Sequence, residues 1–275
     1  KSSAGTPQGT IYGPNDFKLL RNDLVFDTTY TKYVDDTTTL SISTKPDNLD
    51  LQQAANKLLD WTIANRMTVN EKKTKEMLIY FGTKHDTSSV PFITINNKQI
   101  ERVESFKLLG VVISADLSWN LHIDYMLKKV AKRIYCILYL VRAGIKSEDI
   151  VIIYCSIIRS VLEYACQVWH PGLTKRQSSE IERVQKRCLK LIYPNLDYCQ
   201  SLQMSGLEKL ETRRESLTQS LFQEIKDDKH ILHSLLPFRE PSSLRARNSY
   251  PFIIPITKST RFGRAFIPYC ISKRF

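Results

Sequence analysis

The spacing of apolar residues changes at about Asp116, and this change constrains the fold more than any other feature of the sequence. Most apolar residues before it lie in short runs that alternate with polar ones, whereas those after it recur every three or four positions. The first pattern is typical of strands and the second of helices. We therefore expect an α+β chain with three parts: β-hairpins plus one helix in residues 1–115, an all-α helical bundle in 116–195, and a C-terminal helix with a basic aromatic tail in 196–275.

Residues 31–43 are predicted to form a β-hairpin with two adjacent acids at its tip. Strand-forming residues flank Asp35 and Asp36, which lie where the chain must reverse. Carboxylates at an exposed tip suit a hard cation such as Mg²⁺. Because consecutive strand residues face opposite ways, we assign the main metal role to Asp35 and a supporting role to Asp36. The alternative is that Asp-Asp is only a good turn former.

Further strands are expected in the first part, around one amphipathic helix at about 47–66. The apolar run 77–81 predicts a single strand. Residues 92–95 and 100–103 predict a second hairpin around the four polar residues between them. Residues 106–113 predict another strand, broken at Gly110 by a bulge or a close backbone contact.

Three antiparallel helices with short links are expected in the second part, which makes a small bundle. The expected helices are 118–142, closed by Gly144; 147 to about 169; and 174–193, with a fourth at roughly 207–226. The expected N-cap residues are Ser118, Ser147 and Thr174. The arginines of the tail alternate with aromatic residues, which either stack on nucleic-acid bases or pack against the preceding helices.

The positive charge of the chain is concentrated. The formal net charge is +12, yet residues 1–117 hold 14 basic and 14 acidic residues. Residues 118–195 hold 13 basic against 6 acidic residues and residues 239–275 hold 8 against 1, so each stretch carries +7. Such an excess favours a polyanion partner, nucleic acid above all, over a merely solvated surface.

The sequence also argues against a membrane-spanning protein and against a protein that depends on zinc-binding or paired cysteines. No apolar run approaches the ~20 residues that a membrane-spanning helix needs. The six cysteines form no Cys-x-x-Cys pair and have no histidine at zinc-ligand spacing. We expect them to be reduced and mostly buried thiols of an intracellular protein.

Four motifs, in this order, resemble the later palm motifs of reverse transcriptases, and most of all those of non-LTR (LINE-like) retrotransposons. They are Gly5-Thr6-Pro7-Gln8-Gly9 with Gly13-Pro14, Tyr33-Val34-Asp35-Asp36, Asn70-Glu71-Lys72-Lys73-Thr74-Lys75, and Phe106-Lys107-Leu108-Leu109-Gly110. The resemblance covers residues 1–115 well and extends, less specifically, to about 193. It implies a partial right-hand polymerase palm followed by a thumb-like helical bundle.

The resemblance also implies an activity, RNA-directed DNA polymerisation by two-metal nucleotidyl transfer. Asp35 and Asp36 would bind Mg²⁺, or Mn²⁺, at the catalytic site. Tyr33 and Val34 would form the floor of the nucleotide pocket. Lys73 would stabilise charge on the leaving pyrophosphate or donate a proton to it. The implied partners are an RNA template, a DNA primer and dNTPs, in the nucleus or the cytoplasm and away from membranes.

The remaining roles concern the nucleic-acid strands. The residues that would contact the template and the incoming nucleotide are Gly5, Pro7, Gln8 and Gly9. The primer grip would be Leu108, Leu109 and Gly110. The residues that would contact the nucleic-acid backbone from the bundle are Lys128, Lys129, Lys132 and Arg133.

One departure from the family bears on activity. The family's first metal-binding aspartate lies upstream of the Gly-x-Pro-Gln-Gly turn, and this chain starts almost at that turn. Asp16, Asp23 and Asp27 all follow Gly5 and are not convincing replacements. We therefore expect a fragment that is inactive on its own. The rival interpretation is a non-catalytic nucleic-acid-binding remnant that uses the basic bundle and needs no Mg²⁺.

Overall fold

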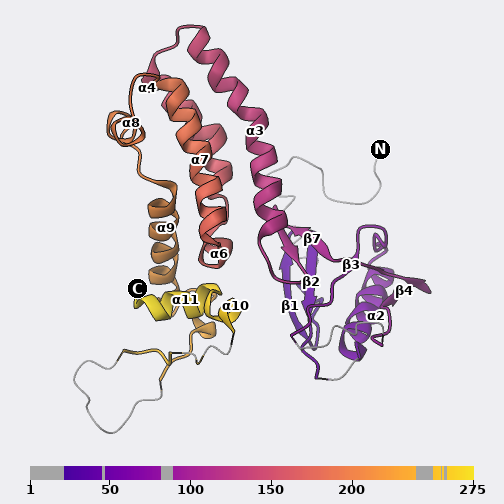
Figure 1. Cartoon of the computed structure of the whole chain (residues 1–275). Coiled ribbons are helices and arrows are strands. Elements are labelled where there is room, and N and C mark those ends of the chain that lie inside the picture. The colour runs from indigo at the N-terminus through magenta and orange to yellow at the C-terminus, as the bar shows by residue number, and fades with distance from the viewer. Residues whose placement is uncertain (1–21, 45–46, 82–88, 240–249, 255, 257–258) are drawn as a thin grey trace. The chain divides into compact units, whose positions relative to one another are not determined.

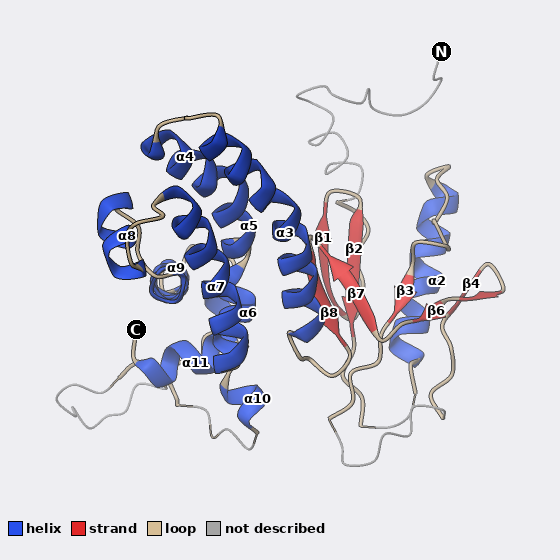
Figure 2. Ribbon diagram, turned by 45° about the horizontal axis from the view of Figure 1, so that its top comes forward, coloured by secondary structure: helices blue, strands red, loops and turns tan. Residues whose placement is uncertain are grey.

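The computed structural model describes residues 22–44, 47–81, 89–239, 250–254, 256 and 259–275 (Figure 1). The chain divides into two compact units, Lys1–Phe106 and Lys107–Phe275, which we call the hairpin unit and the helical unit. The described part is a mixture of helices and small two-stranded sheets (Figure 2), which confirms the coarse expectation of mixed helix and strand. The three-part division at 115 and 195 stays a prediction.

The hairpin unit begins with the predicted hairpin. Strands β1 (Thr29–Tyr33) and β2 (Asp36–Leu40) are antiparallel, and Tyr33 pairs with Asp36. Helix α2 (Leu49–Ala64) confirms the predicted amphipathic helix. A small apolar core holds these elements together because one stripe of α2 faces the segment before β1. Its members are Leu24, Phe26, Tyr30, Ala54, Leu58 and Trp61.

Short strands complete the hairpin unit. Strand β3 (Lys75–Glu76) is parallel to β6 (Glu101–Arg102), and β4 (Thr94–Ile95) is antiparallel to β5 (Lys98–Gln99). The predicted strand at 77–81 is wrong, because pairing stops at Glu76.

The second hairpin is shorter than predicted, with two turn residues in place of four. Asn96 and Asn97 have φ of 52° and 59°. Asparagine tolerates this left-handed conformation, so the turn closes early and the next two residues pair in β5.

A buried ion pair fixes the β3–β6 pairing. The Arg102 Nε donates to Oε2 of Glu76 at 3.0 Å, and the Glu76 side chain is almost fully buried. Arg102 also donates to the carbonyl oxygens of Val90 and Pro91, and its guanidinium lies 4.3 Å from the Phe92 ring centroid. Removing one partner of such a pair leaves a buried charge uncompensated.

A further hairpin leads into the helical unit. Strand β7 (Ser105–Leu108) pairs with β8 (Val111–Ser114) across a turn at Leu109 and Gly110. Both turn residues have positive φ, 45° and 89°, as a two-residue type I′ turn requires. The expectation of one strand is therefore wrong, because the chain reverses at Gly110. Of the two causes expected for the break, a bulge or a close contact, the structure has a close contact, since a Cβ atom at Gly110 would lie 3.0 Å from Cε1 of Tyr164. The residues that the family resemblance assigns to the primer grip, Leu108, Leu109 and Gly110, lie at this reversal.

The helical unit follows (Figure 1). Its helices are α3 (Asn120–Arg142), α4 (Ser147–Tyr154), the π-helical η1 (Cys155–Arg159), α5 (Ser160–Glu163), α6 (Cys166–Trp169), η2 (His170–Gly172), α7 (Lys175–Ile192), α8 (Tyr198–Ser205), α9 (Leu210–Ile225), η3 (His233–Leu235), α10 (Thr260–Gly263) and α11 (Phe266–Lys273). The first, third and fourth predicted helices are confirmed as α3, α7 and α9. Helix α8 was not predicted.

The second predicted helix is not continuous. The chain leaves the helical conformation at Tyr164, and Ala165 is left-handed with φ 49°. Trp169 is fully buried, and its indole Nε1 donates to the Tyr164 carbonyl oxygen at 3.0 Å. This bond satisfies a carbonyl that the break leaves without a helical partner, so burial of Trp169 outweighs the local helical pattern.

One large apolar core fills the helical unit between α3, the α4–α6 segment and α7. Its fully buried members include Val130, Ile158, Leu162, Trp169, Ile181 and Leu189. Two polar side chains inside this core are paired: Tyr154 donates to Oε1 of Gln185 at 2.7 Å, and Gln185 donates to the Glu208 carbonyl oxygen at 2.9 Å. Paired groups avoid the cost of a buried unsatisfied donor or acceptor.

A second core joins the C-terminal segment to α9. It contains Phe222, Ile225, Leu236, Phe252, Cys270 and Ile271, with Tyr250, Phe266, Tyr269 and Phe275 packed against it. The described aromatic residues of the tail thus pack largely against the preceding helix, which was one of the two alternatives drawn from the sequence. These side chains are occupied by packing instead of being free to stack on bases.

The helix caps differ from the expected ones in two of three cases. Thr174 forms a capping box with Gln177: its hydroxyl accepts from the Gln177 N–H at 3.2 Å, and Gln177 Oε1 accepts from the Thr174 N–H at 2.9 Å. The caps predicted at Ser118 and Ser147 are wrong. The N-cap residues there are Trp119 and Lys146, and neither makes a side-chain cap bond.

The six cysteines form no disulfide in the structure. All six cysteines are free, but the expectation that most are buried holds for only half of them: Cys166, Cys188 and Cys270. Burial raises the pKa of Cys166 to about 11 and that of Cys188 to about 12, so both stay protonated at neutral pH. Among the described residues, no helix is both long and apolar enough to cross a membrane.

We predict that Thr174→Ala destabilises the helical unit by about 1 kcal/mol, because it removes the side-chain acceptor of the α7 capping box. Ser147→Ala is the matched control, since Ser147 begins α4 without a side-chain cap bond, and its effect should be within about 0.5 kcal/mol. Urea denaturation followed by far-UV circular dichroism measures both. Equal losses would mean that the capping box contributes nothing specific.

Candidate functional site

The tip of the β1–β2 hairpin carries both predicted metal ligands. Val34 and Asp35 form the two-residue turn, and Asp36 begins β2 in register with Tyr33. Both carboxylates are exposed. The structure therefore brings Tyr33, Val34, Asp35 and Asp36 together at one end of a paired ribbon.

The turn is closed by a backbone conformation that valine rarely adopts. Val34 has φ 50°, whereas Asp35 is outside the positive-φ region. Positive φ at the first turn position alone is the pattern of a type II′ turn, where glycine is the usual residue. A β-branched residue there is strained, and such strain is found mostly where function holds the backbone.

One face of the hairpin anchors it and the other is free. The Tyr30 ring packs edge-on against Phe26, with ring centroids 5.2 Å apart, and joins the core on α2. Tyr33 and Asp36 share the opposite, exposed face because paired residues point to the same side of a sheet. Tyr33 is 62% exposed. The core thus fixes the ribbon while the acid-bearing tip remains open to a ligand.

The donor set at the tip fits part of a magnesium site. Carboxylate oxygens are the ligands that Mg²⁺ prefers, but two carboxylates leave most of its six positions to water or substrate. No cluster of three or more His, Cys, Asp or Glu that could hold a metal occurs in the described part of the chain. Asp23 instead accepts from the Trp61 indole at 2.9 Å, and Asp27 pairs with Lys57 at 3.4 Å.

Lys73 lies in a turn that is held from two sides. The Asn70 carbonyl oxygen accepts from the Lys73 N–H at 3.1 Å, which closes the turn. Glu71 pairs with Lys98 at 2.7 Å and accepts from Asn96 at 2.8 Å, which ties the turn to the β4–β5 hairpin. These bonds also lower the pKa of Glu71. The Lys73 side chain itself is exposed.

The structure does not bring every predicted residue into one site. No hydrogen bond or ion pair joins the described side chain of Lys73 to Asp35 or Asp36. Gly5, Pro7, Gln8 and Gly9 lie outside the described residues. Leu108, Leu109 and Gly110 lie at the β7–β8 turn, and only Leu108 is a strand residue.

The β7–β8 turn is fixed by a tyrosine. The Tyr164 hydroxyl donates to the Leu109 carbonyl oxygen at 2.8 Å. A Cβ atom at Gly110 would lie only 3.0 Å from Cε1 of Tyr164, and Gly110 has φ 89°, so both contact and conformation favour glycine. The break after α5 that places Tyr164 here was not predictable from periodicity.

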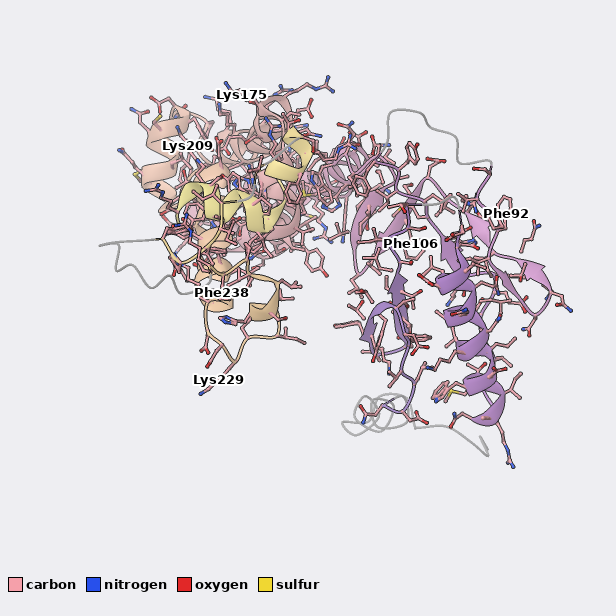
Figure 3. The ribbon with its side chains drawn as sticks, turned by 90° about the horizontal axis from the view of Figure 1, so that it is seen from below. Phe92, Phe106, Lys175, Lys209, Lys229 and Phe238 are labelled. Carbon is pink, nitrogen blue, oxygen red and sulfur yellow. The ribbon has the colours of Figure 1, made fainter. Side chains whose placement is uncertain are left out.

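Helix α3 presents most of the predicted basic residues to solvent. Lys128, Lys129 and Lys132 are exposed, whereas Arg133 is half-buried and its guanidinium donates to the Ile157 carbonyl oxygen. The expectation that Arg133 is an exposed backbone contact therefore needs correction, because the bond to Ile157 ties it to η1. Further exposed basic residues follow on α7: Lys175, Arg176, Arg183, Lys186, Arg187 and Lys190. Lys175 lies at the surface of the helical unit (Figure 3).

A buried polar cluster that the sequence did not predict joins three segments of the helical unit. His170 Nε2 lies 2.9 Å from Oε2 of Glu215, and the Tyr269 hydroxyl donates to the same oxygen at 2.7 Å. The fully buried Arg214 Nε lies 3.4 Å from His170 Nδ1. Burial lowers the pKa of His170 despite the neighbouring Glu215. Because Glu215 of α9 bonds both to His170 and to Tyr269 of α11, the cluster holds α9 and α11 together.

We predict that Val34→Gly protects the β1–β2 amides from exchange more than Val34→Ala does. Glycine relieves the positive-φ strain, whereas alanine keeps a Cβ atom in the same conformation. At an ordinary strand position glycine would be less stable than alanine by about 0.5–1 kcal/mol. Greater protection in Val34→Gly than in Val34→Ala would therefore indicate backbone strain at Val34. Hydrogen exchange of residues 29–40 measures it, and the ordinary order would mean that Val34 is unstrained in solution.

Part of the chain is similar to known proteins, and the matched part includes the hairpin unit. Residues 1–113 match the family described as reverse transcriptase (RNA-dependent DNA polymerase). The chain is 25% identical over 205 residues to the RNA-directed DNA polymerase from mobile element jockey of Drosophila melanogaster, and 26% identical over 204 residues to that of Drosophila funebris. Each match covers 69% of this chain and 22% of the relative. No solved structure matches the chain.

These matches confirm the resemblance that the four motifs indicated, although the chain spans only about a fifth of the length of these curated relatives. The family match begins at Lys1 and ends within β8, so it includes the β1–β2 hairpin, the turn that carries Lys73 and the turn at Gly110. Residues 1–113 of this chain are thus similar to the reverse transcriptase family, and the chain resembles the RNA-directed DNA polymerases of mobile element jockey.

Proposed function

We propose that the chain is part of an RNA-directed DNA polymerase that joins nucleotides by two-metal transfer at Asp35 and Asp36. The observation that carries the proposal is the β1–β2 turn, which presents both carboxylates at the exposed end of a fixed hairpin. This hairpin lies inside the segment that matches the reverse transcriptase family. An Asp-Asp pair that served only as a turn former would need neither this exposure nor a strained valine before it.

The residues of the hairpin unit take distinct roles in this proposal. Asp35 is the main ligand of the divalent cations and Asp36 the supporting one. When bound, Mg²⁺ would act as a Lewis acid on phosphate oxygens and would stabilise the negative charge on the attacking oxygen of the primer. Tyr33 and Val34 form the floor under the nucleotide. The exposed ammonium group of Lys73 stabilises the charge of the leaving pyrophosphate.

The residues of the helical unit hold the nucleic acid. The β7–β8 turn, fixed by the Tyr164 bond to Leu109, acts as the primer grip through its backbone and the side chains of Leu108 and Leu109. Exposed lysines of α3 contact phosphates of the duplex, which gives binding without sequence preference. The template contact is assigned to the segment from Gly5 to Gly9 on the family motif alone.

Two-metal transfer needs acids on both sides of the ion pair, and the pair at the hairpin tip is the one that we assign to it among the described residues. In the family, the first metal-binding aspartate lies upstream of the Gly-x-Pro-Gln-Gly turn, and we propose that the whole polymerase takes its further acid from that position.

We predict that residues 1–275 do not extend a primer on an RNA template, but do so once the fingers and first palm strands of a related element are fused ahead of Lys1. Incorporation of dNTPs with Mg²⁺ or Mn²⁺ is the measurement. Asp35→Asn should abolish the activity of the fusion, while Asp60→Asn, a matched change on the exposed side of α2, should preserve it. A fusion that remains active with Asp35→Asn would show that the hairpin is not catalytic.

A second candidate function is nucleic-acid binding without catalysis. The observation that favours it is the exposed row of lysines on α3 together with the exposed basic residues of α7. This function needs no metal, so it would survive the loss of Asp35 and Asp36.

We predict that residues 1–275 bind duplex nucleic acid with strong salt dependence. Contact with about six phosphates would weaken binding ~10³-fold between 50 and 200 mM salt. Reversing Lys128 and Lys132 to Glu should lower the slope of log affinity against log salt by about 2. Reversing Lys209 and Lys229, which are equally exposed but lie outside α3, makes the same change in net charge and should leave the slope nearly unchanged. Fluorescence anisotropy measures both, and equal slopes would rule out α3 as the interface.

A further inference from the structure

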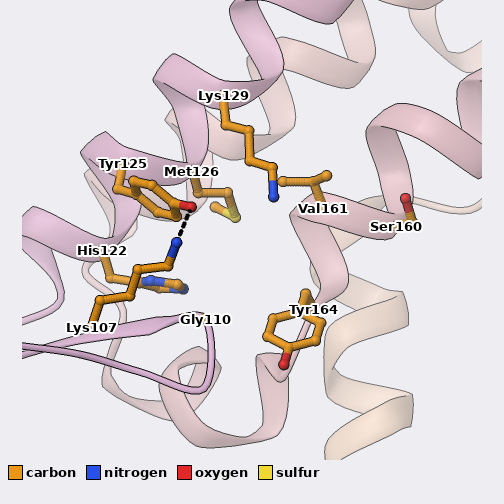
Figure 4. A pocket seen from close by; sticks show the side chains of 9 residues that line it. All are labelled: Lys107, Gly110, His122, Tyr125, Met126, Lys129, Ser160, Val161 and Tyr164. Atoms are coloured by element: carbon orange, nitrogen blue, oxygen red, sulfur yellow. Dashed lines mark hydrogen bonds between the residues drawn. The ribbon is translucent and has the colours of Figure 1, made fainter. Parts of the chain in front are cut away.

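A small cavity lies inside the helical unit, between the β7–β8 turn, α3 and α5 (Figure 4). Its volume is about 190 Å³, which is below the ~300–1,000 Å³ of sites that hold a whole small molecule. It has room for about six water molecules at ~30 Å³ each. The cavity therefore suits a small group instead of a complete nucleotide.

The wall of the cavity holds a buried donor without a partner. His122 is 3% exposed, and its Nδ1 accepts from the Val112 N–H at 3.3 Å. A nitrogen that accepts carries no proton, so the proton of the neutral ring is on Nε2. Burial lowers the pKa of His122, which keeps the ring neutral. Nε2 is buried and has no hydrogen-bond partner among the described residues.

Two lysines add positive charge beside this donor. The Lys107 ammonium group donates to the Tyr125 hydroxyl at 2.7 Å, which holds it over the cavity (Figure 4). Lys129 reaches the cavity from the next turn of α3, and its side chain points into the same space (Figure 4). No acidic residue is among the described residues that line the cavity. The site thus combines two cations and a neutral N–H donor with no carboxylate to balance them.

We propose that this cavity binds one phosphate group, with His122 Nε2–H as the inner donor and the ammonium groups of Lys107 and Lys129 as its counter-charges. A tetrahedral oxyanion accepts from several donors at once, which matches three converging donors of this kind. A ligand would also satisfy the buried N–H, which otherwise costs free energy in the folded state. Ser160, at the start of α5, supplies one further hydroxyl to the lining.

The phosphate group has two possible sources, a nucleic-acid strand or free phosphate, and their shared chemistry is what the cavity recognises. Binding of inorganic phosphate does not depend on metal ions or on the carboxylates of the hairpin unit. Failure of this proposal would therefore leave the polymerase proposal intact, and failure of the polymerase proposal would leave this one intact.

The test is a titration of the full 275-residue chain with inorganic phosphate, followed through the ring signals of His122 by ¹H–¹⁵N NMR. We expect a saturable shift of the Nε2 signal, with Nδ1 remaining unprotonated. Lys129→Gln should weaken binding about tenfold, since it removes a charged hydrogen-bond donor. Lys209→Gln is the matched control: it removes the same charge from an exposed lysine of the helical unit that does not line the cavity, and should leave phosphate affinity unchanged.

Changes at His122 test the inner donor. His122→Asn keeps an acceptor for the Val112 N–H but loses the reach of Nε2, so it should abolish phosphate binding. His122→Gln keeps an amide donor at the longer reach and should retain part of it. If His122→Asn does not fold, as its thermal transition will show, the comparison of Lys129→Gln with Lys209→Gln decides.

A competition experiment identifies the source. Displacement of inorganic phosphate by a short DNA strand would support the cavity as a contact for a strand phosphate. Phosphate binding that DNA does not displace would support a site for the free anion. The proposal is overturned if phosphate leaves the His122 signals unchanged, or if Lys209→Gln and Lys129→Gln weaken binding equally.

Discussion

The tight turn at Val34 and Asp35 is the constraint on which the proposed chemistry depends. It sets the register in which Tyr33 pairs with Asp36, and so decides that both carboxylates stand at the end of the ribbon. The strain at Val34 is sustained because the other face of the hairpin is held on Phe26 and α2. A small apolar core therefore positions charged groups that it does not touch.

The helical unit combines a high positive charge at its surface with a stable apolar core. Some of its buried polar groups bond to one another, as Tyr154 and Gln185 do, which avoids the cost of an unsatisfied donor or acceptor. The lysines of α3 and α7 lie at the surface, where screening by salt limits their mutual repulsion. Several buried side-chain atoms of the described residues have no hydrogen-bond partner, and of these His122 Nε2 belongs to a residue that lines the cavity beside Gly110.

Long periodic elements and the acid-bearing hairpin were predictable from the sequence, whereas features that depend on tertiary contacts were not. Apolar spacing and Thr174 gave α3 and α7 nearly to the residue, because local patterns and packing agree there. The break at Tyr164 depends on where the Trp169 indole is buried, and the bond that withdraws Arg133 depends on η1. Neither leaves a local signal. His122 sits at an apolar position of α3, so sequence spacing indicates burial but cannot show that one nitrogen lacks a partner.

The most direct test of the central claim, that the hairpin tip is a metal-binding half-site, is a Mn²⁺ titration of residues 1–275 followed by NMR. Bound Mn²⁺ broadens the signals of nearby amides, so broadening should begin at Val34, Asp35 and Asp36. Asp35→Asn should abolish this effect, Asp36→Asn should weaken it, and Asp60→Asn on α2 should preserve it. Broadening that begins elsewhere, or that persists at the turn after Asp35→Asn, would contradict the claim.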